Sequence, residues 1–189
     1  AGFYLKMDQQ LGGVNLFLQG AIGGWVQPLD KDGRPATAYA RGDLLASAAQ
    51  RALGESDSLR ESRVHFSASK IEFAVANDGW RQLAALGTIR REITETVRTE
   101  LVWFSIGEIP FISHPGETAP YYSLRSKELM GTQRAFVLGL GMDALGYIIK
   151  PTYFEDPTKP YAEYLTRMSL GPQTGPTLLT AIEQLTSEK

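Results

Sequence analysis

Cysteine is absent from this chain and histidine is scarce, so several kinds of site are excluded at once. The 189 residues include no cysteine and two histidines, His65 and His114. Without thiols the chain has no disulfide, no thiolate metal site and no cysteine nucleophile. A conventional catalytic zinc site takes three protein ligands and a water. The two histidines alone therefore do not make such a site.

A surplus of charge of one sign and a long apolar run are also missing. The formal net charge is −2, and a nearly balanced chain lacks the basic footprint that nucleic acid or an anionic membrane surface would need. No stretch approaches the ~20 apolar residues of a transmembrane helix. The opening AGFYLKMDQQ lacks the charged and apolar regions of a signal peptide. We therefore expect no nucleic-acid partner and no transmembrane segment.

The N-terminal third of the sequence predicts one strand and one helix. The run NLFL at residues 15–18 precedes a glycine-rich turn at residues 20–24, which is typical of a buried strand and a tight loop. Asp43 precedes the alanine-rich run LLASAAQRAL, and Gly54 follows it. An acidic N-cap and a C′ glycine predict a helix between these two residues.

The rest of the chain predicts an interleaved order of strands and helices. Gly107-Glu108 is the expected turn of a hairpin, and Pro110 favours an edge position for its second strand. The expected elements are strands at 64–76, 97–106, 109–113, 135–140 and 146–149, a helix from Thr118 to just before Gly131, and a final helix opened by Pro176. This order predicts an α/β or α+β fold with a mixed β-sheet packed with helices.

Two short motifs match known signatures but stand in the wrong context. GLGMDA at residues 139–144 matches the dinucleotide fingerprint, which requires a following helix to hold the pyrophosphate. The β-like run LGYII and then Pro151 exclude a long helix here. SASK at residues 67–70 matches a serine-acylating signature but falls in a predicted strand and lacks the partner motifs. We interpret both motifs, and a half-buried His65, as structural.

Three segments, in this order, resemble the neutral/alkaline ceramidase family. NLFLQGAIGGWVQP at residues 15–28 is similar to the strand and glycine turn that lead to its GDVSP-type motif. HPGE at residues 114–117, with a helix carrying Arg125 after it, resembles the PGE segment. GLGMDALGYI at residues 139–148 is similar to the GLxNDxxGYI run of bacterial members. The resemblance implies that residues 1–189 are the C-terminal portion of a catalytic domain, with no separate second domain.

The resemblance also implies a zinc cofactor. In that family two histidines from the N-terminal half, the glutamate of PGE and the tyrosine of GYI hold the metal, and the last two correspond here to Glu117 and Tyr147. A helix dipole favours a carboxylate placed just before the helix N-terminus, and a divalent cation favours the deprotonated form of a phenol. His114 would flank this site, and Arg125 would contact substrate.

This sequence departs from the family pattern in two places. The segments that would carry the two histidine ligands lie upstream of residue 1, so we expect an incomplete metal site whose partner is the missing N-terminal half or another chain. Apolar residues at 3–5 and 14–18 would then be exposed and available for association. Gln27 stands where the family has its proposed catalytic serine. Glutamine is no nucleophile, but its amide could orient a carbonyl or a water.

The function that the resemblance implies is zinc-dependent hydrolysis of an N-acyl amide, with a lipid-like substrate and an exported or periplasmic location. The metal would polarise the carbonyl and lower the pKa of the attacking water. The alternative is a non-catalytic, ceramidase-like binding or structural module, which Gln27 favours. A third hypothesis is an unrelated ligand-binding domain whose motifs match by chance.

Overall fold

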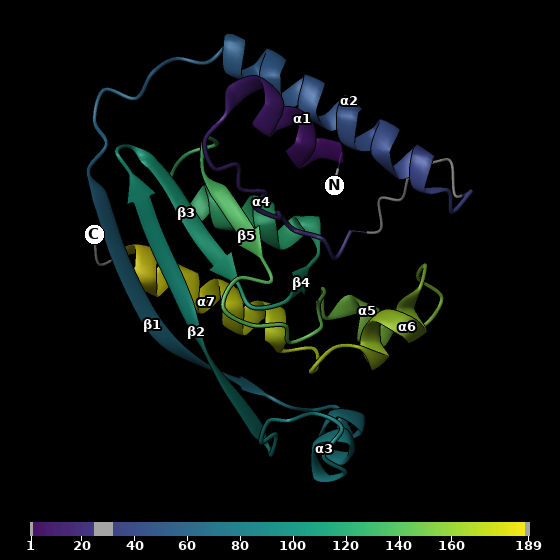
Figure 1. The fold of residues 1–189 in the computed structure, drawn as a ribbon. Helices are drawn as coiled ribbons and strands as arrows, with labels where there is room; N and C mark the ends of the chain where they lie inside the picture. The colour runs from purple at the N-terminus through teal and green to yellow at the C-terminus, as the bar shows by residue number, and fades with distance from the viewer. Residues whose placement is uncertain (1, 25–31, 188–189) are drawn as a thin grey trace. The chain divides into compact units, whose positions relative to one another are not determined.

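The computed structural model describes residues 2–24 and 32–187, which form two compact units (Figure 1). The smaller unit contains the described residues 2–18 and 32–60, and the larger contains 19–24 and 61–187. The described residues form seven helices, a four-stranded sheet and a two-stranded parallel ladder. The fold is therefore mixed α/β, as the order of sequence patterns predicts.

The smaller unit is a pair of helices, α1 (Gly2–Leu11) and α2 (Pro35–Gly54). Met7 of α1 and Ala46 of α2 are buried, and Lys6 Nζ donates to Ser47 Oγ at 2.8 Å. α2 ends close to the predicted place but includes Gly54, which is expected just beyond it, and the helix begins at Pro35, so Asp43 lies inside it. Proline at the first helical position presets the backbone, so the helix needs no acidic cap at Asp43.

The predicted strand at residues 15–18 is wrong. These residues are irregular and exposed, with Leu16, Phe17 and Leu18 all more than half accessible and Val14 90% accessible. A strand needs a neighbour for its backbone hydrogen bonds. Within residues 2–24 and 32–187 no strand pairs with this segment, so its apolar composition alone does not make it one. Its exposure agrees with the apolar surface expected near the N-terminus.

The larger unit is organised around a mixed sheet with strand order β1-β2-β3-β5. β1, β2 and β3 are antiparallel neighbours, and β5 is parallel to β3. A separate ladder pairs β4 with β6 in parallel. The bounds are β1 (Val64–Ala74), β2 (Thr96–Ile106), β3 (Ile109–His114), β4 (Glu117–Thr118), β5 (Phe136–Gly139) and β6 (Tyr147–Ile148).

The hairpin between β2 and β3 has the predicted turn but not the predicted edge. Ile106 pairs with Ile109, and Gly107 has a φ of 55°, the positive value that the first turn residue requires. β3 lies between β2 and β5, so it is an interior strand. Pro110 is tolerated there because the pairing with β5 begins only at Phe111, beyond the residue without a backbone N–H.

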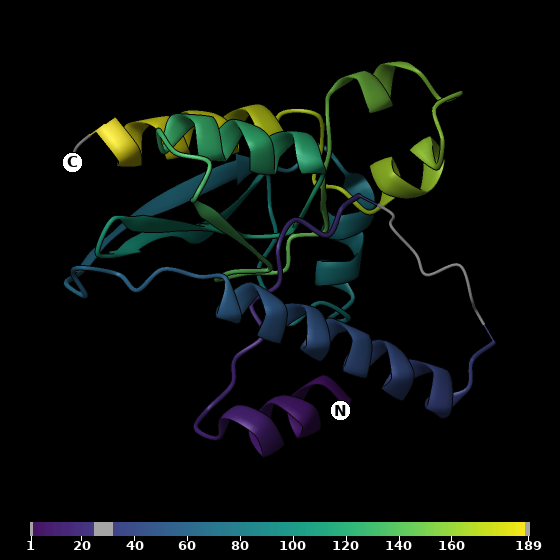
Figure 2. The ribbon, with the colours of Figure 1, turned by 90° about the horizontal axis from the view of Figure 1, so that it is seen from above.

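Helices α4 and α7 lie side by side along one face of the sheet, where Figure 2 shows them in green and yellow. From the sheet Phe73, Leu101 and Ile112 join Leu178 and Ile182 of α7 in the buried core. α4 begins at Pro120, because Thr118 belongs to β4 rather than to the helix. The helices of this unit are α3 (Asp78–Ala85), α4 (Pro120–Leu129), α5 (Thr152–Glu155), α6 (Ala162–Arg167) and α7 (Thr174–Ser187).

The opposite face of the sheet carries a row of four phenylalanines, one from each strand. Phe66 pairs with Phe104, Phe104 with Phe111, and Phe111 with Phe136. The rings of Phe104 and Phe111 stack with centroids 4.6 Å apart, and those of Phe111 and Phe136 stack at 5.0 Å. Side chains alternate between the two faces of a strand, so this row points away from the Phe73 core. Phe66 remains 67% exposed.

The structure settles the context of the two misleading motifs. No helix follows GLGMDA before β6, so the dinucleotide fingerprint lacks its pyrophosphate-binding element. SASK lies inside β1, as predicted, while His65 in the same strand is exposed rather than half-buried. None of the helices in the described part of the chain is long and apolar enough to cross a membrane.

The two faces of β1 predict unequal effects of the same substitution. Phe73 is fully buried and Phe66 is 67% exposed. We expect Phe73→Ala to lower the free energy of unfolding by about 3–5 kcal/mol, and the matched Phe66→Ala by about 1 kcal/mol or less. Chemical denaturation followed by tryptophan fluorescence measures both, because Trp80 and Trp103 pack against this core. Equal losses would show that the phenylalanine row is as deeply packed as the core.

Candidate functional site

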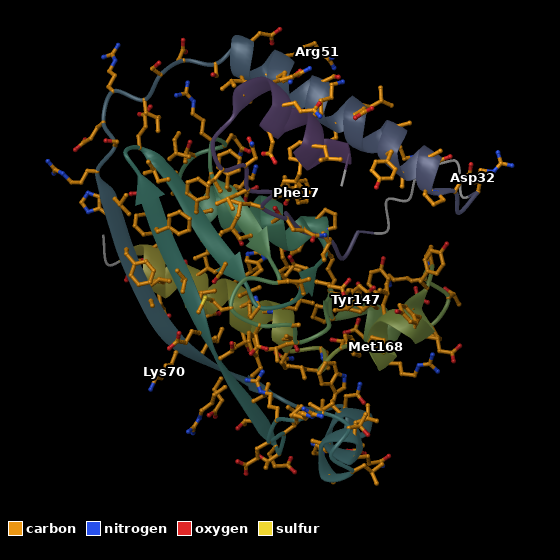
Figure 3. The ribbon with its side chains drawn as sticks, in the orientation of Figure 1. Phe17, Asp32, Arg51, Lys70, Tyr147 and Met168 are labelled. Carbon is orange, nitrogen blue, oxygen red and sulfur yellow. The ribbon has the colours of Figure 1, made fainter. Side chains whose placement is uncertain are left out.

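The β4–β6 ladder places Glu117 directly opposite Tyr147. The N–H of Glu117 donates to the carbonyl of Gly146 at 2.9 Å, so the backbone fixes this register. Tyr147 is held from its other side, where its N–H donates to the carbonyl of Met168 at 2.9 Å; Figure 3 labels these two residues next to each other. Two candidate ligands that are 30 residues apart in sequence, from 117 to 147, thus become neighbours.

Gly146 makes this close approach possible. Its φ is 74°, a left-handed conformation that side chains disfavour. A Cβ at this position would lie 2.1 Å from the carbonyl oxygen of Met168. The chain therefore turns sharply into β6 only because residue 146 has no side chain, and Tyr147 takes its position from that turn.

The side chains of the pair also interact. The Tyr147 hydroxyl is hydrogen-bonded to the Glu117 carboxylate and to Tyr164. Burial, the negative charge of Glu117 and the contact with Tyr164 all raise the pKa of Tyr147 above that of an ordinary tyrosine. The phenol therefore keeps its proton at neutral pH and donates it to Glu117. A divalent cation would reverse this preference, because it favours the phenolate.

Tyr164 is the site residue that sequence reasoning missed. It lies in α6, and its ring meets that of Tyr147 edge to face, with centroids 5.8 Å apart and an interplanar angle of 61°. No pattern in the sequence predicts the short helices α5 and α6. Without them nothing indicates that residue 164 returns to the ladder. Its ring therefore contacts the Tyr147 ring directly, in addition to the contact of Tyr147 with Glu117.

His114, predicted to flank the site, is fully buried at the end of β3. Its Nδ1 lies 2.9 Å from Thr118 Oγ1, and its Nε2 lies 3.0 Å from Ser126 Oγ. Burial lowers the pKa of His114 to about 3, so the ring is neutral. Because both ring nitrogens have hydrogen-bonding partners, neither is open to a metal ion.

Arg125 and Gln27 are not brought to the Glu117–Tyr147 pair by any described contact. Arg125 is exposed on α4, where it forms an ion pair with Glu128. Gln27 lies outside the described residues. The described end of the glycine turn before it does reach β4, since the N–H of Gly23 donates to the carbonyl of Thr118 at 2.9 Å. The proposed roles of Arg125 and Gln27 stay predictions.

The donor set fits part of a zinc site. Glu117 supplies a carboxylate, an ordinary zinc ligand, and Tyr147 supplies a phenol that a cation can deprotonate. Within residues 2–24 and 32–187 no three histidine, aspartate or glutamate side chains gather into a metal-binding group. A catalytic zinc site uses three protein ligands, and the ladder brings two candidate ligands together.

Comparison with solved structures identifies the class of fold. The chain matches a crystal structure of neutral ceramidase from Pseudomonas aeruginosa with a TM-score of 0.66 at 12% sequence identity. The match covers 98% of this chain and 39% of that ceramidase, so this chain spans about two fifths of its length. The resemblance read from three sequence segments is therefore confirmed at the level of the fold.

One further structural match has a lower TM-score. A second structure, of a ceramidase complexed with C2, matches with a TM-score of 0.38 and 13% identity, over 49% of this chain and 14% of that one. No protein-family model matches the sequence. No curated protein matches it at a significant level.

The pairing of Glu117 with Tyr147 predicts a measurable change in ionisation. In Glu117→Gln the negative charge is lost, so the phenolate is less disfavoured and the pKa of Tyr147 falls, while burial keeps it above that of a free tyrosine. NMR titration of chains with labelled tyrosine ring carbons measures this, with Tyr147→Phe assigning the signal. The control Glu128→Gln, which removes the exposed partner of Arg125, leaves the Tyr147 titration unchanged. An unchanged titration in Glu117→Gln would contradict the contact.

Proposed function

We propose that this chain is the C-terminal part of a ceramidase-like catalytic domain that hydrolyses an N-acyl amide bond. The observation that carries the proposal is the direct pairing of Glu117 and Tyr147, two candidate oxygen ligands, in a fold that matches part of neutral ceramidase. When bound, zinc would polarise the substrate carbonyl and lower the pKa of the attacking water. The substrate class is an N-acyl amide, with a lipid-like acyl chain.

Each residue of the pair has a distinct role in this proposal. Glu117 contributes a negative oxygen held in register by its backbone bond to Gly146. Tyr147 contributes a phenol oxygen whose proton now rests against Glu117, and Tyr164 steadies its ring. Gln27, at the position of the family serine, would orient the substrate carbonyl through its amide. Arg125 on α4 would contact the polar part of the substrate.

The proposal requires ligands that the described residues lack. Catalytic zinc sites use three protein ligands, and the ladder offers Glu117 and Tyr147. The other ligands would come from the part of the domain that has no counterpart in this chain, whose match covers 39% of the ceramidase. Either an N-terminal half or another chain is therefore the expected partner.

A non-catalytic, ceramidase-like binding module is the second candidate. Gln27 favours it, because a glutamine where the family carries its serine removes a nucleophile. In this case Glu117 and Tyr147 would hold a metal or a ligand without turnover.

Zinc binding by the isolated chain tests the ligand assignment. Two oxygen ligands should bind zinc only weakly in equilibrium dialysis, and Glu117→Gln combined with Tyr147→Phe should abolish that binding. Glu128→Gln serves as the control because it removes an exposed carboxylate that pairs with Arg125. Nanomolar zinc binding that survives loss of both Glu117 and Tyr147 would overturn the assignment.

Turnover by a longer polypeptide that includes the upstream reading frame tests the reaction. We expect zinc-dependent hydrolysis of a fluorogenic N-acyl amide. Loss of Glu117 should reduce it by more than the about 10–100-fold typical of an outer-sphere partner, since Glu117 is proposed as a ligand. Binding of the substrate analogue without hydrolysis would favour the non-catalytic module instead.

A further inference from the structure

A buried chain of polar side chains lies next to the strand that carries Glu117, and the proposed function makes no use of it. His114 at the end of β3, Thr118 in β4 and Ser126 in α4 are all fully buried. His114 bridges the other two, with Nδ1 2.9 Å from Thr118 Oγ1 and Nε2 3.0 Å from Ser126 Oγ. A single imidazole thus joins β3 to both β4 and α4.

The direction of each hydrogen bond follows from the available protons. Ser126 Oγ donates its one proton to the carbonyl of Tyr122 at 2.7 Å. Ser126 can then only accept from the imidazole, so Nε2 of His114 carries the ring proton. In the neutral ring Nδ1 is an acceptor, and Thr118 Oγ1 donates to it. Each polar side-chain atom of His114, Thr118 and Ser126 thus has a hydrogen-bonding partner, as buried groups require.

The ring holds Thr118 only while it is neutral. A charged imidazole would carry a proton on Nδ1 as well and would face the Thr118 hydroxyl with a donor. Burial lowers the pKa of His114 to about 3, which keeps the ring neutral over the physiological range. The Thr118 hydroxyl therefore keeps the same hydrogen-bond acceptor over the physiological pH range.

Thr118 in turn determines how Glu117 is presented. Thr118 pairs with Ile148 as Glu117 pairs with Tyr147, in a ladder that has no other residue pair. Consecutive side chains of a strand point to opposite sides. Thr118 is anchored in the interior by His114, so Glu117 is turned outward, where it is partly exposed and meets Tyr147.

We propose that His114 is a positioning residue, which acts through Thr118 to hold Glu117 against Tyr147. The consequence for catalysis rests on the proposed function. The positioning of Glu117 involves only residues of this protein and can be tested without zinc or substrate. Histidine suits this position because its two ring nitrogens reach β4 and α4 at once, one as an acceptor and the other as a donor.

Two substitutions of His114 test the hydrogen bonds of its two ring nitrogens one at a time. In His114→Asn the amide oxygen lies near the position of Nδ1 and can still accept from Thr118, but the contact with Ser126 is lost. In His114→Gln the amide nitrogen lies near Nε2 and can still donate to Ser126, but Thr118 loses its acceptor. The readout is the labelled ring-carbon NMR signal of Tyr147 in the full chain. We expect His114→Asn to keep that signal and His114→Gln to shift it toward the signal of Glu117→Gln.

A second pair of variants covers the case in which His114 variants fail to fold. Thr118→Val removes the hydroxyl at nearly constant shape and should shift the Tyr147 signal, while Thr118→Ser keeps the hydroxyl and should not. His65→Gln, at an exposed histidine, controls for the substitution itself. A wild-type Tyr147 signal in folded His114→Gln or in Thr118→Val would show that His114 only fills the core. The readout uses neither zinc nor substrate, so it separates this inference from the proposed activity.

Discussion

The arrangement of the candidate site depends on a ladder of two residue pairs. β4 and β6 are each two residues long, and an isolated ladder of that size has almost no stability of its own. It persists because its neighbours hold both strands: Gly146 turns the chain into β6, Met168 accepts the N–H of Tyr147, and His114 anchors Thr118. The register of Glu117 with Tyr147 is thus set by contacts on every side of the ladder rather than by the ladder itself.

The sequence predicts the elements whose patterns are local and fails where tertiary context decides. β1, the hairpin and α7 follow from alternation, turn chemistry and a one-sided apolar face, and all are present. Residues 15–18 have the composition of a strand but no described partner, and a strand cannot be stable without one. The start of α2 fails for another reason, since Pro35 is as good an initiator as Asp43 and lies further upstream.

The candidate site shows the same division. The resemblance selects Glu117 and Tyr147 as ligands of one metal and so predicts that they lie close together. Their pairing in one ladder could not be predicted, because β4 is only two residues long. Tyr164 could not be found, because α6 is too short for a periodic signal and its return to β6 is a tertiary event. The two partners of His114 were equally hidden, since Thr118 and Ser126 come from different elements than the histidine.

The two faces of the sheet differ in what covers them and in their residues. One face is sealed by α4 and α7 over a continuous apolar core. The other begins as a phenylalanine row and ends with charged residues, where Glu72 pairs with Arg98 across the strands. Aromatic residues with few charges are typical of surfaces that other protein layers cover, and a charged border is typical of the rim of such a surface.

The electrostatics of the Glu117–Tyr147 pair determine the protonation of the phenol. Every described influence on the phenol raises the pKa of Tyr147, and none comes from a neighbouring cation. A phenolate would therefore stand beside a carboxylate with no positive charge to offset it, so the folded chain keeps one proton between the two oxygens. The hydrogen bond between the two side chains depends on that proton, because a phenolate and a carboxylate side by side would repel each other.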